Sequence, residues 1–336
     1  MTTSVSAIHA SAPTRIDLAG GTLDIWPLFL FHENAQTLNA AISLRAHADV
    51  LPRVDGRLRL ESIDTRSTLE VETWRHLRQS TELPLLARLA YFFRAENLTL
   101  RTRGESPAGA GIAGSSALNV AVCGALARWA GLSIEAEALL TIAQNVEAQV
   151  IAVPTGSQDY RPAYYGGVAA VELGPRGTTR VGLNVDLLEL QRRIVLCYTG
   201  APRNSGTNNW EITKRHIDGD AQVHACFERI RDAAVSARDS LERGDWGGLA
   251  RDIRAEWQAR QQLAPGVTTT AIDTLIQGAI SAGATAAKVC GAGGGGCLFC
   301  LAEPDRADAV RHALAAGGAR LLDYHIERDG LRVTVD

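Results

Sequence analysis

The segment Pro107-Ala-Gly-Ala-Gly-Ile-Ala-Gly-Ser-Ser-Ala-Leu118 lies between a predicted strand and a predicted helix. The alternation of apolar and polar residues over 98–102 predicts the strand, and the apolar, alanine-rich residues 118–129 predict the helix. Glycines let a backbone approach a ligand closely, and the free N–H groups at a helix start attract anions. The segment is therefore typical of a phosphate-binding loop, in which Ser115 and Ser116 can reach phosphate oxygens or a metal ion. A glycine-rich turn with a serine cap is the structural alternative.

The composition is that of a globular protein, with 336 residues, 46% apolar and 21% charged. A formal charge of -3 gives no reason to expect nucleic acid or an anionic membrane as a partner. We find neither an apolar run that could span a bilayer nor a leader pattern at the start. The cysteines lie in apolar contexts, and the pair Cys297 and Cys300 has no second pair, so we expect buried, reduced thiols. These features predict a cytoplasmic protein.

The sequence pattern changes near residue 200. Before it, we expect strands at 13–18, 40–51, 57–63, 167–173 and 194–198, helices at 84–94 and 134–150, and a loop at 153–165. After it, we expect helices at 207–243, 245–262, 268–282 and 305–316, and strands at 286–289, 297–301, 320–326 and 331–335. The chain is thus predicted to be α+β, with an N-terminal domain at 1–200 and a C-terminal domain at 201–336 that share a cleft.

Two carboxylates follow the glycine-rich loop, Glu147 on a predicted helix and Asp159 in a segment with proline and glycine. Phosphoryl transfer needs a metal ion to spread the phosphate charge and often a carboxylate to accept the hydroxyl proton. Glu147 suits the metal role and Asp159 the proton role. The alternative is that both are solvated surface acids.

A second glycine-rich run, residues 291–296 (GAGGGG), lies between two predicted strands. So many glycines disfavour any regular element, and a tight turn needs only one or two. We expect the backbone here to meet a close neighbour, either a ligand or the first glycine-rich loop.

The histidines are not clustered in the sequence and lack metal-ligand spacing. We therefore expect all of them to be structural or surface residues: His9, His32, His47, His76, His216, His224, His312 and His325.

Three segments together resemble the motifs of the GHMP kinase superfamily, named for galacto-, homoserine, mevalonate and phosphomevalonate kinases. They are residues 12–24 (APTRIDLAGGTLD), 107–117 and 288–297 (KVCGAGGGGC), and their order and separation also match. The resemblance implies an N-terminal domain like ribosomal-protein S5 domain 2, a C-terminal ferredoxin-like domain, and an active site between them. It also implies ATP and Mg²⁺ as cofactors.

The resemblance further implies roles for single residues. The ATP phosphates would lie over Pro107, Gly109, Ala110, Gly111, Ile112, Ala113, Gly114, Ser115 and Ser116. Ser116 and Glu147 match the Mg²⁺ ligands, although one extra residue in the loop leaves Ser115 as an alternative. Asp159 matches the acid that takes the substrate proton, and Arg15 matches the basic residue that keeps that acid ionised.

Finer matching favours the sugar kinases, and among them the D-glycero-D-manno-heptose 7-phosphate kinase group, which phosphorylates an anomeric hydroxyl. Gln158-Asp159 followed by Gly166-Gly167 carries this resemblance, together with residues 198–205. The substrate site would then contain Gly21, Thr22, Asp24, Tyr160, Arg203, Gly293 and Gly294. Arg203, with Lys214 beyond it, could bind a sugar phosphate, or it could be a solvated loop arginine.

The predicted protein is therefore an ATP-dependent kinase of a sugar or sugar phosphate, a monomer or homodimer with no nucleic-acid or membrane partner. Within the superfamily, the alternative is a mevalonate-pathway kinase or a diphosphomevalonate-decarboxylase-like enzyme. An alternative of another class is a non-catalytic regulator that keeps the fold, against which the presence of Glu147, Asp159 and the two serines argues.

Overall fold

The computed structural model describes residues 6–202 and 205–336. Within them, eight strands form a sheet in the order β12-β1-β2-β5-β3-β4, with β6 paired to β2 and β7 to β6. The strands are β1 (Ile8–Ala19), β2 (Gln36–Pro52), β3 (Leu58–Ser62), β4 (Ser67–Val71), β5 (Leu98–Gly104), β6 (Val168–Gly174), β7 (Gly177–Gly182) and β12 (Arg332–Val335). Only the β3–β5 pair among these is parallel.

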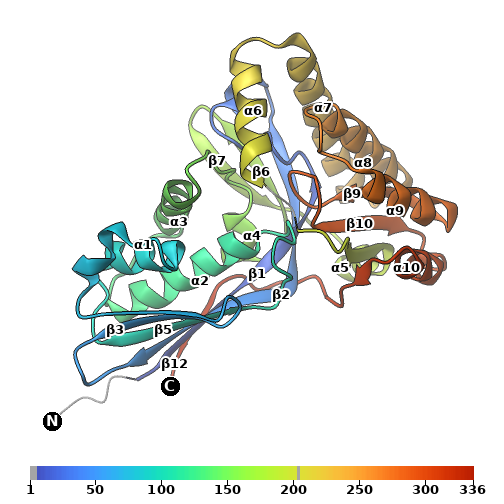
Figure 1. Ribbon diagram of the computed structural model, residues 1–336. Coiled ribbons are helices and arrows are strands. Elements are labelled where there is room, and N and C mark those ends of the chain that lie inside the picture. Colours follow the sequence, from blue (N-terminus) through green and yellow to red (C-terminus); the bar gives the residue numbers. More distant parts are fainter. Residues whose placement is uncertain (1–5, 203–204) are drawn as a thin grey trace.

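One face of this sheet carries helices (Figure 1). They are α1 (Pro84–Phe92), α2 (Gly114–Trp129), α3 (Ala136–Ile151) and α4 (Tyr160–Tyr165), and short 3-10 helices occur at η1 (Leu28–Phe31) and η2 (Trp74–Gln79). The helix α2 is buried along almost its whole length, because its small side chains allow it to pack between the sheet and α3.

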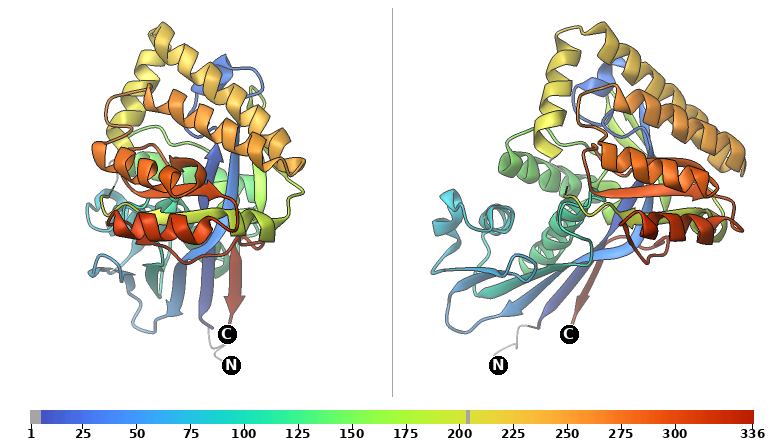
Figure 2. Two further views of the ribbon diagram at one scale, coloured as in Figure 1. Left: turned by 90° about the vertical axis from the view of Figure 1, so that its right-hand side faces the viewer. Right: turned by 45° about the vertical axis from the view of Figure 1, so that its right-hand side comes forward.

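A smaller antiparallel sheet has the order β11-β8-β10-β9. Its strands are β8 (Ile194–Tyr198), β9 (Ala284–Val289), β10 (Cys297–Ala302) and β11 (Arg320–Leu321). Around it lie α5 (Leu187–Arg193), α8 (Trp246–Gln261), α9 (Thr270–Ser281) and α10 (Ala307–Ala316), and α7 (Ala221–Glu242) packs on α8 and on strands β1 and β2. Helix α6 (Ser205–Ile217) stands apart at one end (Figure 2).

A shared core joins the two sheets. Ile16 and Leu38 from the large sheet pack in one cluster with Ile253 of α8 and Phe299 of β10, and all four are fully buried. The domain boundary between residues 200 and 201 stays a prediction. Each sheet contains strands from both sides of it: β8, before the boundary, belongs to the small sheet, and β12, after it, pairs with β1 in the large sheet.

Several elements differ from the sequence prediction. The single helix expected at 207–243 is two helices, since Gly219 takes a left-handed φ of 83° and the Asp220 side chain caps α7. The loop expected at 153–165 ends in α4, and the strand expected at 320–326 is reduced to β11 and one bridge at Ile326. Strand β7 and helix α5 were not predicted, because both are short and bury few residues, only Leu190 in α5 and none in β7.

Candidate active site

The glycine-rich loop leads into the N-terminus of α2. Gly109, Gly111 and Ala113 take left-handed φ values of 67°, 71° and 64°, and no side chain caps the helix at Ala113. The first N–H groups of α2 are therefore left for a ligand. A hollow of about 620 Å³ lies here, lined by residues 106–111, by 113–116 and by Glu147 and Asp159. The 16-residue helix α2 thus opens into the hollow with an uncapped N-terminus, and such a helix end suits an anion such as a phosphate.

Glu147 on α3 accepts hydrogen bonds from three hydroxyl groups. Ser115 Oγ lies 2.5 Å from Oε1, Ser116 Oγ lies 3.0 Å from Oε2, and Tyr160 OH lies 2.8 Å from Oε2. Both serines are therefore within reach of the same carboxylate, and the geometry does not separate them. Burial, then Glu147, raises the pKa of Tyr160 well above its usual value, so its hydroxyl stays a donor.

Tyr160 lies on the side of Glu147, and its place in a substrate site stays a prediction. We expected it among the substrate residues, but its ring is buried in the helical layer of the large sheet and its hydroxyl is held by Glu147. It lines the hollow of the glycine-rich loop and not the neighbouring opening. Tyr160 begins α4, and the helix turns the side chain away from Asp159 toward α3.

Asp159 and Arg15 form an ion pair at the wall between two openings. Arg15 on β1 donates from Nε at 3.0 Å and from Nη2 at 2.6 Å, both to Oδ1 of Asp159. The arginine also donates from Nη1 to the carbonyls of Gly111 at 3.1 Å and Cys290 at 2.7 Å. Arg15 is thus fixed by both glycine-rich segments, and it fixes Asp159 in turn.

A small opening adjoins the hollow on the other side of Asp159. Its lining includes Thr22 and Asp24, together with Arg15, Ile25, Gly156, Gln158, Asp159, Asn209, Arg260, Gly291 and Ala292. Gly156, Asp159 and Asn209 line both spaces. Asp24 is buried, and its Oδ2 accepts a hydrogen bond of 2.8 Å from the Gln158 N–H. Burial, then the nearby charge of Asp159, raises the pKa of Asp24 to about 6.

The second glycine-rich run meets the first, as one of the two alternatives predicted. The Cys297 N–H donates to the Ala110 carbonyl at 2.6 Å, and a Cβ on Gly296 would stand 2.6 Å from that same oxygen. Gly293 and Gly294 do not line the opening. They pack on the backbone of Gly266 and Val267. Gly291 and Ala292 line the opening instead, and the place of Gly293 and Gly294 in a substrate site stays a prediction.

Sequence reasoning missed a buried ionic cluster behind the opening. Arg260 on α8 and Lys288 on β9 lie between Asp17 and Glu256, with Lys288 Nζ 2.9 Å from Glu256 and 3.6 Å from Asp17. Burial alone would raise the pKa of Asp17, but Lys288 and Arg260 outweigh it and lower that pKa. Arg260 also donates to the Gly21 carbonyl at 2.9 Å, and a Cβ on Gly21 would collide with Asp17. Gly21 is thus a packing position beside Thr22.

The predicted cationic end of the substrate site is only partly described. Arg203 lies outside the described residues. Lys214 forms an exposed pair with Asp218 at 2.5 Å in the last turn of α6. The two cations in the opening, Arg15 and Arg260, already pair with carboxylates.

Two further predictions meet opposite outcomes. The cysteines are buried and free, as expected. The histidines are not all isolated, because His32, His216 and His224 come together in the folded chain. They lie on three different elements, so no sequence spacing could reveal the cluster.

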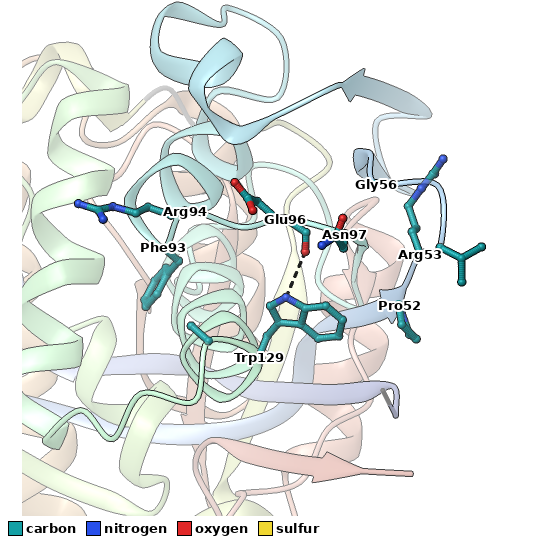
Figure 3. A pocket seen from close by; sticks show the side chains of 10 residues that line it. Pro52, Arg53, Gly56, Phe93, Arg94, Glu96, Asn97 and Trp129 are labelled. Atoms are coloured by element: carbon teal, nitrogen blue, oxygen red, sulfur yellow. Dashed lines mark hydrogen bonds between the residues drawn. The ribbon is translucent and has the colours of Figure 1, made fainter. Parts of the chain in front are cut away.

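Another hollow lies far from these residues. It has a volume of about 540 Å³ and is lined by Phe93, Arg53 and Trp129 at the opposite end of α2 (Figure 3). The Trp129 indole N–H donates to the Glu96 carbonyl at 3.3 Å, and Arg53 pairs with Asp55 and Glu70. None of the predicted site residues lies here, so we place the candidate active site at the glycine-rich loop.

No described helix is both long enough and apolar enough to cross a membrane.

Two family models match the chain: "GHMP kinases N terminal domain" at residues 73–167 and "GHMP kinases C terminal" at 237–320. A D-glycero-alpha-D-manno-heptose 7-phosphate kinase from Campylobacter jejuni is 28% identical over 98% of this chain and 99% of its own. A mevalonate kinase from Thermococcus sibiricus is 26% identical over 97% and 98%.

A solved structure, of a D-glycero-D-manno-heptose 1-phosphate kinase from Bacteroides thetaiotaomicron, has the same fold. It superposes with a TM-score of 0.78 at 23% identity and covers 97% of this chain and 98% of its own. The N-terminal model contains the glycine-rich loop, Glu147 and Asp159, the C-terminal model contains Arg260, Gly291 and Ala292, and together the two cover more than half of the chain. The chain therefore belongs to the GHMP kinases, with their N- and C-terminal domains, and is an ATP-dependent kinase of a small molecule.

Proposed function

We propose that this kinase transfers the γ-phosphoryl group of Mg²⁺-bound ATP to a hydroxyl group of a sugar or sugar phosphate. The observation that carries the proposal is the position of Asp159. Its carboxylate stands between the hollow at the glycine-rich loop and the opening at Asp24, and it lines both. A phosphate donor on one side and a hydroxyl acceptor on the other would meet at this side chain.

The donor side fits a nucleotide phosphate and a magnesium ion. The uncapped N–H groups of α2 and the loop glycines would bind phosphate oxygens. Glu147, Ser115 and Ser116 offer only oxygen atoms, which Mg²⁺ prefers, and Tyr160 orients the Glu147 carboxylate. Mg²⁺ would supply positive charge against the charge that develops on the phosphates.

The acceptor side fits general base catalysis by Asp159. Both Arg15 contacts go to Oδ1, so among the described residues Oδ2 makes no hydrogen bond and is left to take a hydroxyl proton. The Arg15 guanidinium stabilises the negative charge of Asp159. Because β1, the loop at Gly111 and the carbonyl of Cys290 hold Arg15, the base is positioned before substrate binds.

For the acceptor itself, the best candidate is the anomeric hydroxyl of a heptose 7-phosphate. The support is the similarity to a heptose 7-phosphate kinase over almost the whole chain. Asp24 and Thr22 line the opening as a carboxylate and a hydroxyl, the groups that bind sugar hydroxyls. Mevalonate is the second candidate, since mevalonate kinases of similar identity and coverage also match the chain.

An acceptor screen tests the proposal. ADP release would be followed with ATP and Mg²⁺ against hexoses, hexose phosphates, heptose 7-phosphates, mevalonate and diphosphomevalonate, with CO₂ measured in parallel. We expect acceptor-dependent ADP release with a sugar or sugar phosphate. Turnover of mevalonate alone would move the assignment to the second candidate, and stoichiometric CO₂ release would contradict the kinase assignment. Absence of turnover across the panel would favour a non-catalytic role.

A further inference from the structure

Three histidines converge outside the candidate active site. His32 follows η1, His216 lies in the last turn of α6, and His224 lies in the first turn of α7. One ring nitrogen of each lies within 4.8 Å of those of the other two. The helices α6 and α7 meet at the end of the molecule where this cluster lies (Figure 1).

The hydrogen bonds of two of the histidines fix which nitrogen carries the proton. His32 Nδ1 contacts the Glu228 carboxylate, and His224 Nε2 lies 2.9 Å from the His216 carbonyl oxygen. A carboxylate and a carbonyl only accept, so each of these nitrogens donates. In the neutral rings, His32 Nε2 and His224 Nδ1 then carry free lone pairs. Histidines that ligate metals are held in this way, with the other ring N–H bound to a carboxylate or a carbonyl.

His216 completes the cluster, and one of its two ring nitrogens lacks a partner among the described residues. It is 1% exposed, and its Nδ1 is buried without a hydrogen bond in the described structure. Its Nε2 faces His32 Nε2 at 2.8 Å, and its ring stacks on that of His224 with centroids 3.8 Å apart. Neutral imidazole is the form in which histidine binds metals.

We propose that His32, His216 and His224 form a binding site for one zinc-class divalent metal ion, with Glu228 orienting His32. Neutral imidazoles are the ligands that Zn²⁺, Co²⁺ and Ni²⁺ share, whereas Mg²⁺ prefers oxygen. Ring stacking and an N–H···N hydrogen bond from His216 Nε2 to His32 Nε2 could hold the cluster together without an ion. What favours an ion is that three histidines converge, and that His32 and His224 each have their other ring N–H bound to an acceptor.

To accommodate the ion, His32 and His216 would move slightly apart, and the His224 ring, which is stacked on His216, would turn toward it. Tetrahedral Zn²⁺ with Zn–N bonds of about 2.0–2.1 Å places ligand nitrogens about 3.3 Å apart. The 2.8 Å separation between His32 and His216 would widen by a few tenths of an ångström. Three protein ligands leave a fourth position for water. Glu228, which also pairs with Arg231, supplies a negative charge next to the cation.

The metal site would join three elements of the fold. The ion would tie the end of η1 to α6 and α7, and α6 also carries Asn209, which lines both spaces at Asp159. The metal would therefore be structural, and it would set where α6 stands beside the candidate active site.

The test is direct metal binding to the full chain, purified without a polyhistidine tag and stripped with a chelator. Co²⁺ would be titrated in excess Mg²⁺, which occupies oxygen sites, and followed by its visible absorption, with Zn²⁺ competition to give the affinity. His224→Gln removes a partly exposed ligand and keeps a donor for the His216 carbonyl. Glu228→Gln keeps all three ligands and changes only the group behind His32. His312→Gln, at an exposed histidine on α10, is the matched control.

We expect one Co²⁺ per chain in wild type and in the His312 control, displaced by one Zn²⁺. His224→Gln should weaken binding by roughly 100-fold, and Glu228→Gln by about 10- to 100-fold. Circular dichroism of the stripped variants checks the fold. If His224→Gln does not fold, Glu228→Gln decides. Less than one bound ion in wild type, or unchanged affinity in a folded His224 or Glu228 variant, would overturn the site.

Discussion

Arg15 Nη2 lies 2.6 Å from Asp159 Oδ1, although the two residues are 144 positions apart in the sequence. The arginine side chain is 3% exposed and the aspartate side chain 22%. The charge that organises this pair is therefore buried, while the carboxylate it holds is open to a substrate. A base held in this way needs little reorganisation of its side chain when the acceptor binds.

Replacing the base tests its role in turnover. Asp159→Asn keeps the shape of the side chain but cannot take the hydroxyl proton, so kcat should fall by about 10²- to 10⁴-fold. Binding of ATP, measured by calorimetry, should stay close to wild type, because the phosphate loop is untouched. Turnover near the wild-type rate would show that another group is the base.

The serines and Glu147 make a prediction about magnesium. Glu147→Gln should raise the Mg²⁺ concentration for half-maximal rate by at least roughly tenfold, since a neutral amide is a weaker ligand. Ser116→Ala should raise this Mg²⁺ concentration more than Ser115→Ala does. Ser115 is exposed, so water can replace its hydroxyl, whereas Ser116 is buried. Equal Mg²⁺ dependence in all three variants would place the ion elsewhere.

The raised pKa of Asp24 predicts a pH effect on acceptor use. With a pKa of about 6, Asp24 is mostly protonated at pH 5 and mostly ionised at pH 7. If the ionised form accepts hydrogen bonds from sugar hydroxyls, kcat/KM for the acceptor rises with pH through about 6. Asp24→Asn should lower kcat/KM at pH 7 and remove this step from the profile. A step that persists in the variant would assign it to another group.

The same pKa predicts the sign of a stability change. The folded chain binds the Asp24 proton more tightly than the unfolded chain, so ionising Asp24 costs stability as pH rises from about 4 through 6. Asp24→Asn should therefore be at least as stable as wild type at pH 7, by chemical denaturation. A less stable variant would mean that the charged form is the one the fold prefers.

The buried ionic cluster predicts a large loss of stability when one member is removed. Arg260→Met leaves Asp17 and Glu256 with less positive charge in a buried site, and the free energy of unfolding should fall by about 3–5 kcal/mol. Urea denaturation measures it. The matched control is Lys214→Met, at an exposed pair, where we expect no measurable change. Equal effects in the two variants would contradict the cluster's role.

The contact between the two glycine-rich runs can be tested with a matched pair. Gly296 and Gly318 have similar left-handed φ values of 83° and 87°, but only a Cβ on Gly296 meets another atom within 4 Å. Gly296→Ala and Gly318→Ala should share a backbone cost of about 1 kcal/mol. Gly296→Ala should in addition weaken ATP binding, because the new Cβ pushes on Ala110 in the phosphate loop. Unchanged ATP affinity in Gly296→Ala would show that the second glycine-rich run does not influence the ATP-binding loop.

The sequence could predict the parts of the site that local chemistry defines. Glycine-rich loops and the carboxylates Glu147 and Asp159 can be found in the sequence because backbone freedom and charge are properties of single residues. The number of glycines in the second run predicted a close neighbour, either a ligand or the first glycine-rich loop, and the contact with Ala110 is the second of these. Alternation predicted most of the strands, as in β5, although β12 is exposed along its whole length and much of β1 and β2 is buried on both faces.

What failed depended on contacts between distant residues. The buried cluster needs Asp17, Arg260 and Lys288 from three elements, and the histidine cluster needs three more. The sequence could not show that Tyr160 turns toward Glu147, because the helix that begins there sends neighbouring side chains in different directions. A run of glycines likewise does not show which of its members lines the opening, as Gly291 does and Gly293 does not.

The most direct test of the proposed function is the position of the new phosphate. The kinase would be incubated with ATP, Mg²⁺ and a D-glycero-D-manno-heptose 7-phosphate, and the product followed by ³¹P NMR, with Asp159→Asn as the control. We predict a second phosphate signal, coupled to the anomeric proton, that grows with ADP in wild type and is lost in the variant. No new sugar phosphate from this or any other sugar acceptor, with mevalonate phosphorylated instead, would contradict the account.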